Sequence, residues 1–287
     1  MRSAVSGLHV VFLLVVLTAC NGNGTVTTAA VPATSSTVDS STSPSTLPPV
    51  VECPGAGEFE EGGGIADVGG EGSDSSNLGQ ISWETNDRCE SFAFGFETSE
   101  GAPATTVPDI RIDHLASFQV IRITMDIDAA VVTDQLVETA LVDRLYVVRA
   151  LDEAILVDLH LIAPAAARAT IRSSPATLTL ELRPGFVGFE GGSTIAEEIV
   201  VVSPPEEGSV ESPVQVEGYT RTFGADVGIV GTRGGAVIDE TSTTSADLHD
   251  VETWSQFRAE LDLTPGDVTV FVGGGGAEDV IIDLTVS

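Results

Sequence analysis

Apolar and polar residues alternate at a period of two in several segments, and this pattern constrains the fold more than any other feature of the chain. Thr177–Arg183 reads Thr-Leu-Thr-Leu-Glu-Leu-Arg, and Phe257–Leu263 and Val280–Val286 alternate in the same way. Because successive side chains of a β-strand point to opposite faces, each of these segments has one apolar and one polar face as a strand. Gly- and Pro-rich stretches separate the segments, as turns require. The chain is therefore predicted to be all-β.

Similar patterns predict further strands in both halves of the chain. They are Ser91–Phe96, Gln119–Met125, Ile155–Leu161, Ile199–Val202, Val214–Gly218, Val227–Val230 and Val268–Val272. Strands of this length, joined by Gly/Pro turns, are typical of small antiparallel sandwiches. Two segments depart from the pattern: Val132–Ala140 is predicted as a short helix or helical turn, and Cys53–Gly79 as a long Gly- and acid-rich loop.

The β segments fall into two groups. Gly185–Thr194 is rich in Gly and Ser and is predicted to be a flexible linker between them. We therefore expect two small antiparallel β-sandwich domains, one over residues 53–185 and one over residues 197–287. The second contains enough alternating strands to form two facing apolar surfaces, so we expect it to fold alone.

The N-terminus has the features of a secretory signal. Arg2 precedes a short apolar run, Val10–Leu17, which leads into Leu17-Thr18-Ala19-Cys20. A charged start, a short apolar core and a small-residue cleavage site define such a signal, and the core is too short to span a membrane. Leu-Thr-Ala-Cys also resembles a bacterial lipobox, whose cysteine is lipidated and then acylated. Residues 1–19 are therefore predicted as a signal peptide and Cys20 as the lipidation site.

Lipidation would place the protein on the extracytoplasmic face of a bacterial cell membrane, because several acyl chains on one residue are sufficient for stable anchoring. Residues 20–52 consist mainly of Thr, Ser, Ala, Val, Pro and Gly and show no apolar periodicity. This composition is typical of disorder. We expect these residues to form a disordered tether between the membrane and the β domains.

Charge excludes several classes of function. The chain has 12 basic and 43 acidic residues, for a formal net charge of −31, and none of the basic residues is lysine. Such a charge repels nucleic acid, so no nucleic-acid partner is expected. Without lysine the chain has no Walker A loop, no Schiff-base lysine and no Ser-x-x-Lys nucleophile. No cofactor is expected.

The cysteine count predicts one disulfide. If Cys20 is lipidated, Cys53 and Cys89 remain, and outside the cytosol such a pair persists as a disulfide. A zinc site is a poor alternative, because the two cysteines have neither a Cys-x-x-Cys spacing nor a paired histidine.

The second β group resembles the immunoglobulin-like Gmad domain of bacterial spore-germination and sporulation proteins. The residues that carry the resemblance are Ser203-Pro204, Ser212–Gly218 with its Ser-Pro-x-x-Val-x-Gly pattern, Phe223, Phe257 and Ile282–Val286. Gly224 stands where the family often has an acidic residue. The resemblance implies an immunoglobulin-like sandwich and no catalytic residues.

The first β group, from about Ile81 to Arg183, is similar to AMIN-like domains of actinobacterial lipoproteins. Arg88–Phe94 and Leu178–Leu182 carry the similarity. AMIN domains are β-sandwich modules that target envelope proteins to the cell wall or to a secretion apparatus. This resemblance also implies no catalytic residues.

Few residues form a recognisable chemical motif. His114, His160 and His249 lack a second histidine at metal-binding spacing. His160 shares a strand face with Asp158, which is compatible with proton transfer but more often marks an exposed pair of side chains on a strand. Asp126-Ile-Asp128 resembles the start of a calcium loop but lacks its Gly and Glu.

The two tryptophans are candidate sugar-binding residues. Trp83 and Trp254 are able to stack on sugar rings, although packing in or beside the core is commoner.

We expect a non-catalytic, membrane-anchored envelope lipoprotein that binds peptidoglycan, another wall glycan or an envelope protein. Two alternatives stay open: a cell-wall hydrolase whose carboxylate pair no motif reveals, and a structural spacer.

Overall fold

The computed structural model describes residues 53, 57–70, 72–186, 191–221, 224–247, 254–274 and 279–287. All of them belong to one compact unit, Pro49–Ser287. The predicted signal peptide, the lipidation site Cys20 and nearly all of the predicted tether lie outside the described residues, as do Phe223 and His249.

The described chain is all-β, as the alternation predicts, and the only helix within it is a short 3-10 helix, Ala116–Phe118. In the first β block, residues 57–186, the strands are β1 Gly63–Val68, β2 Asn77–Thr85, β3 Glu90–Glu97, β4 Ile110–Leu115, β5 Val120–Met125, β6 Ala129–Ala130, β7 Gln135–Leu136, β8 Val142–Arg149, β9 Ile155–Leu161, β10 Ala165–Arg172 and β11 Thr177–Pro184. In the second β block, residues 191–287, they are β12 Thr194–Ile195, β13 Ile199–Ser203, β14 Ser209–Val210, β15 Val214–Thr220, β16 Asp226–Arg233, β17 Ala236–Thr244, β18 Trp254–Leu261, β19 Gly266–Gly274 and β20 Val280–Val286.

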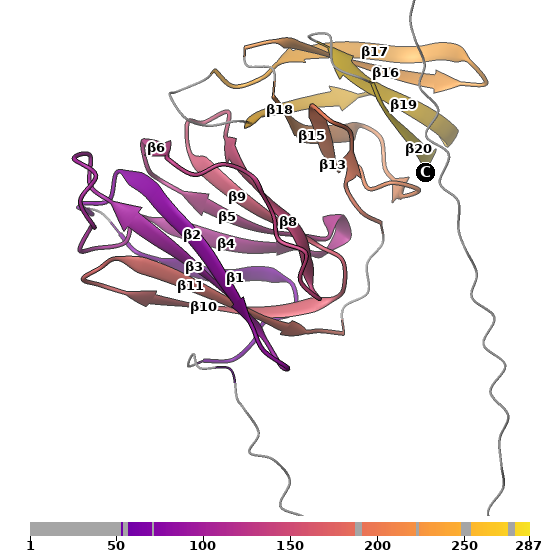
Figure 1. Ribbon diagram of the computed structural model, residues 1–287. Coiled ribbons are helices and arrows are strands. Elements are labelled where there is room, and N and C mark those ends of the chain that lie inside the picture. The colour runs from indigo at the N-terminus through magenta and orange to yellow at the C-terminus, as the bar shows by residue number, and fades with distance from the viewer. Residues whose placement is uncertain are drawn as a thin grey trace, which may run out of the picture. The chain divides into compact units, whose positions relative to one another are not determined.

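The strands form three sheets (Figure 1). One five-stranded sheet, in the order β10-β11-β3-β2-β6, lies in the first block, and another, β14-β20-β19-β16-β17, lies in the second. The third sheet has the order β1-β4-β5-β9-β8-β18-β15-β13-β12 and so includes strands of both blocks, with β7 paired to β8. Most strand pairs are antiparallel, but β8 and β18 pair in parallel through two residues of each strand.

Each block has its own hydrophobic core. In the first, the alternation of β3 directs Phe92, Phe94 and Phe96 inward, where they are almost completely buried. In the second, Phe257 and Ile282 occupy the same kind of position. Burial of one such side chain stabilises the fold by about 1.5–3 kcal/mol, so the inward faces fix the strand register.

A third apolar cluster joins the two blocks. It contains Tyr146 and Val148 of β8 together with Val200 of β13, Tyr219 of β15 and Trp254 of β18, all of them buried. The two blocks therefore share packed side chains as well as the β8–β18 pairing. The independent folding of the second block stays a prediction.

Two local predictions are wrong. Val132–Ala140 does not form a helix: it contains the short strand β7, and Glu138 has a left-handed φ of 53° that no α-helix accommodates. The backbone N–H groups of Val137 and Glu138 donate to the carbonyl of Asp143 instead of to helical partners. Cys53–Gly79 is also more than a loop, since it contains β1, which pairs with β4, and the start of β2.

Candidate functional site

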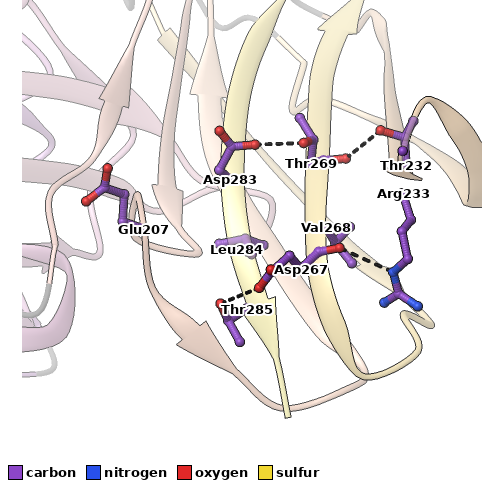
Figure 2. Close-up of a pocket in the computed structure, with 10 residues that line it drawn as sticks. Glu207, Thr232, Arg233, Asp267, Val268, Thr269, Asp283, Leu284 and Thr285 are labelled. Atoms are coloured by element: carbon purple, nitrogen blue, oxygen red, sulfur yellow. Dashed lines mark hydrogen bonds between the residues drawn. The ribbon is translucent and has the colours of Figure 1, made fainter.

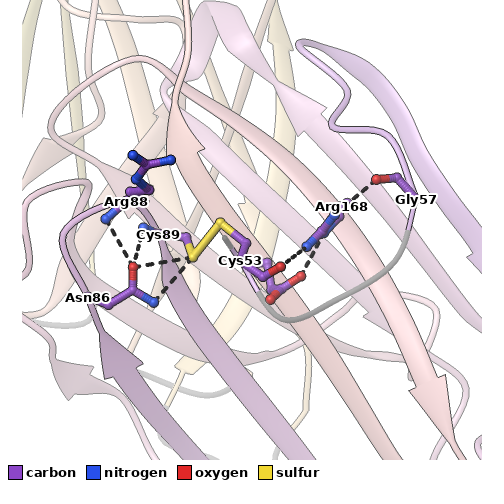
Figure 3. The surroundings of a disulfide bond; sticks show 7 residues. Cys53, Gly57, Asn86, Arg88, Cys89 and Arg168 are labelled. Atoms are coloured by element: carbon purple, nitrogen blue, oxygen red, sulfur yellow. Dashed lines mark hydrogen bonds and ion pairs between the residues drawn. A yellow bond between two sulfur atoms is a disulfide. The ribbon is translucent and has the colours of Figure 1, made fainter. Parts of the chain in front are cut away.

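The predicted disulfide joins Cys53 to Cys89, which lies immediately before β3 (Figure 3). Arg168 of β10 holds the same segment by a second route. Its guanidinium donates to the carbonyls of Gly57 and Cys53, at 3.0 and 3.1 Å, and its Nε lies 2.6 Å from a carboxylate oxygen of Glu181. Cys53 and Gly57 are therefore fixed against the β10-β11-β3-β2 sheet.

The outward side of this sheet carries small and hydroxyl-bearing side chains in its middle rows, and we call it the open face. The same side also carries Glu84 and Glu97, and the buried ion pair of Arg168 with Glu181. One row across the strands consists of Thr170, Thr179, Ala93 and Ser82, each paired in register with the next. The adjacent rows add Ser91, Gly95 and Thr177 to the open face. These residues alternate with the core-facing phenylalanines and leucines of β3 and β11, which is why they point outward.

A cavity lies at each end of the open face. The first, of about 330 Å³, is lined by Gly95, Thr177 and Arg172 among others, with Glu97 at its β3 side. The second, of about 720 Å³, lies beside the disulfide and includes Phe59, Arg88 and Arg183 in its lining. The face is therefore bounded at both ends by hollows that contain arginine.

The outward side of β5, β9 and β8 also carries polar residues, but β13, β15 and β18 cover it, and we call it the covered face. Arg122 forms a two-bond pair with Asp158, at 2.9 and 2.7 Å, and a third bond to Glu217 of β15. His160 Nε2 lies 2.5 Å from the Tyr219 hydroxyl, which also lies 3.2 Å from Asp158. These contacts join the two blocks through hydrogen bonds and charge.

Burial sets the ionisation of the covered face. It lowers the pKa of His160 to about 4, and it raises the pKa of Tyr219 well above its ordinary value. Burial opposes ionisation of Glu217 as well, but the charges and hydrogen bonds of Arg122 and Arg258 together outweigh it and lower the pKa of that carboxyl. The ion pairs are therefore formed at neutral pH and the histidine is neutral.

The interpretation of Asp158 and His160 as an exposed pair is wrong, because their side of β9 faces the second block instead of solvent. Asp158 is 0% exposed and His160 6%. The proton-transfer alternative requires a substrate to reach these side chains, and Tyr219 lies over both. In this structure the pair connects the two blocks.

The remaining predicted residues are dispersed. Asp126 and Asp128 line a cavity of about 510 Å³ together with Asp152 and Glu153. Within the part of the chain that the structure describes, no group of three or more His, Cys, Asp or Glu residues is placed to hold a metal ion. His114 is buried in the first block, where burial lowers its pKa.

Both tryptophans pack against the protein. Trp83 is partly buried beside Phe92, with ring centroids 6.5 Å apart, and Trp254 is 2% exposed, with the guanidinium of Arg221 over its ring. The commoner expectation, packing in or beside the core, therefore describes both residues.

A fourth hollow, of about 370 Å³, lies on the β14-β20-β19-β16-β17 sheet (Figure 2). Its carboxylates are bound across the strands, since Thr269 donates to Asp283 and Thr285 donates to Asp267, at 2.7 and 3.1 Å. Arg233 donates to the backbone carbonyl of Asp267. These groups connect neighbouring strands, so the open face of the first block is the better candidate for ligand binding.

Sequence reasoning missed the open face and the partners of His160. The sequence pattern that indicates the open face is the set of residues that alternate with the apolar ones. Ser91-x-Ala93-x-Gly95 and Thr177-x-Thr179 have small residues at every second position. The signal for the covered face was the run Tyr146-Val147-Val148, which is apolar on both sides of a strand and thus indicates burial on both.

Part of the second β block matches a known protein family. Residues 198–279 match the family described as the immunoglobulin-like domain of bacterial spore germination. The match supports the Gmad resemblance of the second block. No curated protein matches the chain in sequence.

One solved structure with some likeness is a polysaccharide lyase, at 9% sequence identity over 72% of this chain and with a TM-score of 0.18. The chain spans about a third of that lyase, 33% of its length. A likeness this low does not inform fold or function.

No helix in the described residues is long and apolar enough to cross a membrane.

Proposed function

We propose that this protein is a non-catalytic lipoprotein of the bacterial cell envelope that binds cell-wall glycan on the open face. The observation that carries the proposal is the lining of that face. Ser and Thr hydroxyls both donate and accept hydrogen bonds, as sugar hydroxyls do. The small side chains of Ala93 and Gly95 allow a sugar ring to approach the strands closely, and the cavities at both ends leave room for a chain to continue.

The proposed anchor is lipid on Cys20. A tether of residues 20–52 reaches roughly 30 Å as a random coil, which would lift the β blocks off the bilayer and toward the wall. A Cys20→Ala variant is expected to leave the membrane fraction or to remain an uncleaved precursor. Fractionation and migration identical to those of the unmodified sequence would contradict the anchor.

Burial of the most reactive constellation supports a non-catalytic role. Among the described residues, His160, Asp158 and Tyr219 form the one His–carboxylate–Tyr group, and all three are buried between the blocks. The open face, by contrast, carries hydroxyls and arginines without a neighbouring histidine among the described residues. Binding without turnover is the chemistry that such a surface supplies.

The test is co-sedimentation of the purified protein with insoluble cell-wall glycan. Ala93→Trp places a large ring at the centre of the open face and is expected to abolish most of the bound fraction. Ser242→Trp is the matched control, because Ser242 is an exposed residue of β17 in the other block. Equal binding by both variants would contradict the proposal. Sustained release of soluble fragments from the glycan, lost on changing one carboxylate, would favour a hydrolase.

A further inference from the structure

Arg88, Arg172 and Arg183 differ from every other arginine in the described part of the chain. None of their three guanidinium groups makes a hydrogen bond or ion pair with a described residue, and all three residues are exposed. The other described arginines bind carboxylates, a tyrosine hydroxyl or backbone carbonyls: Arg111, Arg122, Arg144, Arg149, Arg168, Arg221, Arg233 and Arg258.

These three arginines lie in the two cavities that bound the open face. Arg172 lines the cavity at one end, and Arg88 and Arg183 line the cavity at the other. In a chain with a formal net charge of −31, unpaired positive charge collects at this one sheet. The acidic surface of the rest of the protein repels an anion, whereas the guanidinium groups at this sheet attract it.

Arg183 is held in place without losing its hydrogen-bonding capacity. Its guanidinium carbon lies 4.4 Å from the ring centroid of Phe59, and Arg168 lies at the same distance from that ring. Arg168 uses its donors on Glu181 and two carbonyls, whereas those of Arg183 have no described partner. A stacked, planar guanidinium with free N–H groups fits carboxylate or phosphate oxygens in a bidentate manner.

The spacing of the arginines suits an extended ligand. Arg172 pairs in register with Thr177 at the start of β11, and Arg183 stands six positions further along the same strand. At about 3.3 Å per residue, the two ends of the face are roughly 20 Å apart. The hydroxyl-bearing row that includes Thr170 and Thr179 lies between them, and so does the buried Arg168–Glu181 pair, whose arginine donates to the carbonyls of Cys53 and Gly57. A single small ion cannot bridge this distance, but a polymer can.

Two carboxylates restrict where the anionic groups bind. Glu97 lines the same cavity as Arg172, and Glu58 lines the same cavity as Arg183. Both repel an anion, whereas the carboxylate of Glu181 on β11 is already paired with Arg168, so anionic groups would be bound at the guanidinium groups themselves.

We infer that the open face binds an extended acidic glycan, with Arg183 and Arg88 binding its carboxylate or phosphate groups at one end and Arg172 at the other. The inference rests on the proposed function and adds the chemical class of the ligand. Carboxylate and phosphate share the recognition chemistry, so the test has a separate arm for each.

The experiment measures binding of the purified protein to three fluorescent probes at low salt: an oligogalacturonate, a neutral galactose oligomer of equal length, and polyphosphate. Binding to at least one acidic probe is expected, with weaker binding to the neutral oligomer. Arg183→Gln is expected to weaken that binding by about 10-fold or more, because a hydrogen bond to a charged group is lost. Arg172→Gln is expected to weaken binding of the longer probes. Arg111→Gln is the control, since Arg111 is exposed but paired with Asp113 on β4.

The outcomes separate the inference from the proposed function. Preference for oligogalacturonate over polyphosphate identifies carboxylate as the source of the charge, and the reverse identifies phosphate. Equal binding of the neutral and acidic oligomers, or no effect of Arg183→Gln, overturns the inference while leaving glycan binding intact. Binding of polyphosphate alone, together with failure to co-sediment with wall glycan, supports the arginine site and contradicts the proposed function. Failure to bind any probe overturns the inference.

Discussion

The open face and the covered face are the two outward sides of the same sandwich, and both are polar, yet only one of them is exposed. The open face offers Thr179, Ala93 and Ser82, which are small, uncharged and only partly buried or exposed. The covered face offers Arg122, Asp158 and His160, which are charged or titratable and almost completely enclosed. The residues that look most reactive in the sequence are thus the ones that are buried between the two blocks.

The difference shows how the two faces are stabilised. A buried charge is tolerated only when it is paired and hydrogen-bonded, and Arg122 has two carboxylate partners from two different blocks. Surface hydroxyls need no such partners, because water satisfies them. The covered face therefore depends on exact pairing, and the open face is free to vary.

Removal of Arg122 should destabilise the protein most. Arg122→Ala leaves the buried Asp158 without its ion-pair partner, while Glu217 keeps Arg258, and breaking a buried pair in this way costs about 3–5 kcal/mol. Urea titration of the variant and of the unmodified sequence measures the difference in the free energy of unfolding. Arg111→Ala serves as the control and should cost about 1 kcal/mol or less, because its side chain is 70% exposed. Equal losses for the two variants would mean that the covered face is not enclosed in solution.

The disulfide beside the open face should have the next largest effect. Its cysteines are separated by 36 positions, and closure of such a loop stabilises the folded state by up to about 4 kcal/mol through the entropy of the unfolded chain. Reduction should lower the melting temperature, measured by circular dichroism with and without a thiol reductant. Identical melting curves, with two free thiols found before reduction, would show that the bond does not form.

Acid should weaken the covered face through His160. Its pKa is about 4 when folded, against an ordinary value of 6.5, because burial disfavours the charged ring. Below pH 6.5 the unfolded chain takes up a proton that the folded chain does not, so the free energy of unfolding falls as the pH falls toward 4. The whole difference corresponds to about 3 kcal/mol.

Urea titrations at a series of pH values measure this loss, and His160→Gln should flatten the profile between pH 6.5 and 4.5. The lowered pKa of Glu217 contributes in the same direction at lower pH, where this carboxyl takes up a proton in the unfolded chain before it does so in the folded one. A profile that is unchanged in His160→Gln would place the histidine in contact with water.

The open face should tolerate change with the smallest effect on stability. Thr179→Ala removes a hydroxyl and a methyl group from a partly exposed strand position, and such substitutions are usually within about 0.5 kcal/mol of neutral. The same urea titration measures this. A loss of several kcal/mol would show that the row is packed against another part of the chain and is not a free surface.

The sequence predicted the strands better than it predicted what covers them. The alternation of Gln119–Met125 and Thr177–Arg183 matches β5 and β11 closely, because one buried face is enough to fix the period. It could not show that β9 is buried on both sides, since the covering strand β15 comes about 60 residues later in the chain. Val132–Ala140 was misassigned for a related reason: its backbone is satisfied by β8, a tertiary partner, instead of by its own residues.

The candidate site was predictable only in part. The pairing of Cys53 with Cys89 followed from counting cysteines, and the structure contains that bond. The three unpaired arginines did not stand out, because whether an arginine has a partner depends on which carboxylates the fold brings near it. Arg168 and Arg183 lie on the paired strands β10 and β11. Only Arg168 has a glutamate, Glu181, opposite it in register on the neighbouring strand.

Residue-resolved amide chemical shifts, recorded while soluble wall glycan is added, report on both faces in one experiment. Glycan binding on the open face should produce concentration-dependent shifts at Ala93, Thr179 and Arg183, and none at Asp158 and His160 on the covered face. Shifts confined to the second β block, or an unchanged spectrum at saturating glycan, would contradict binding at the open face.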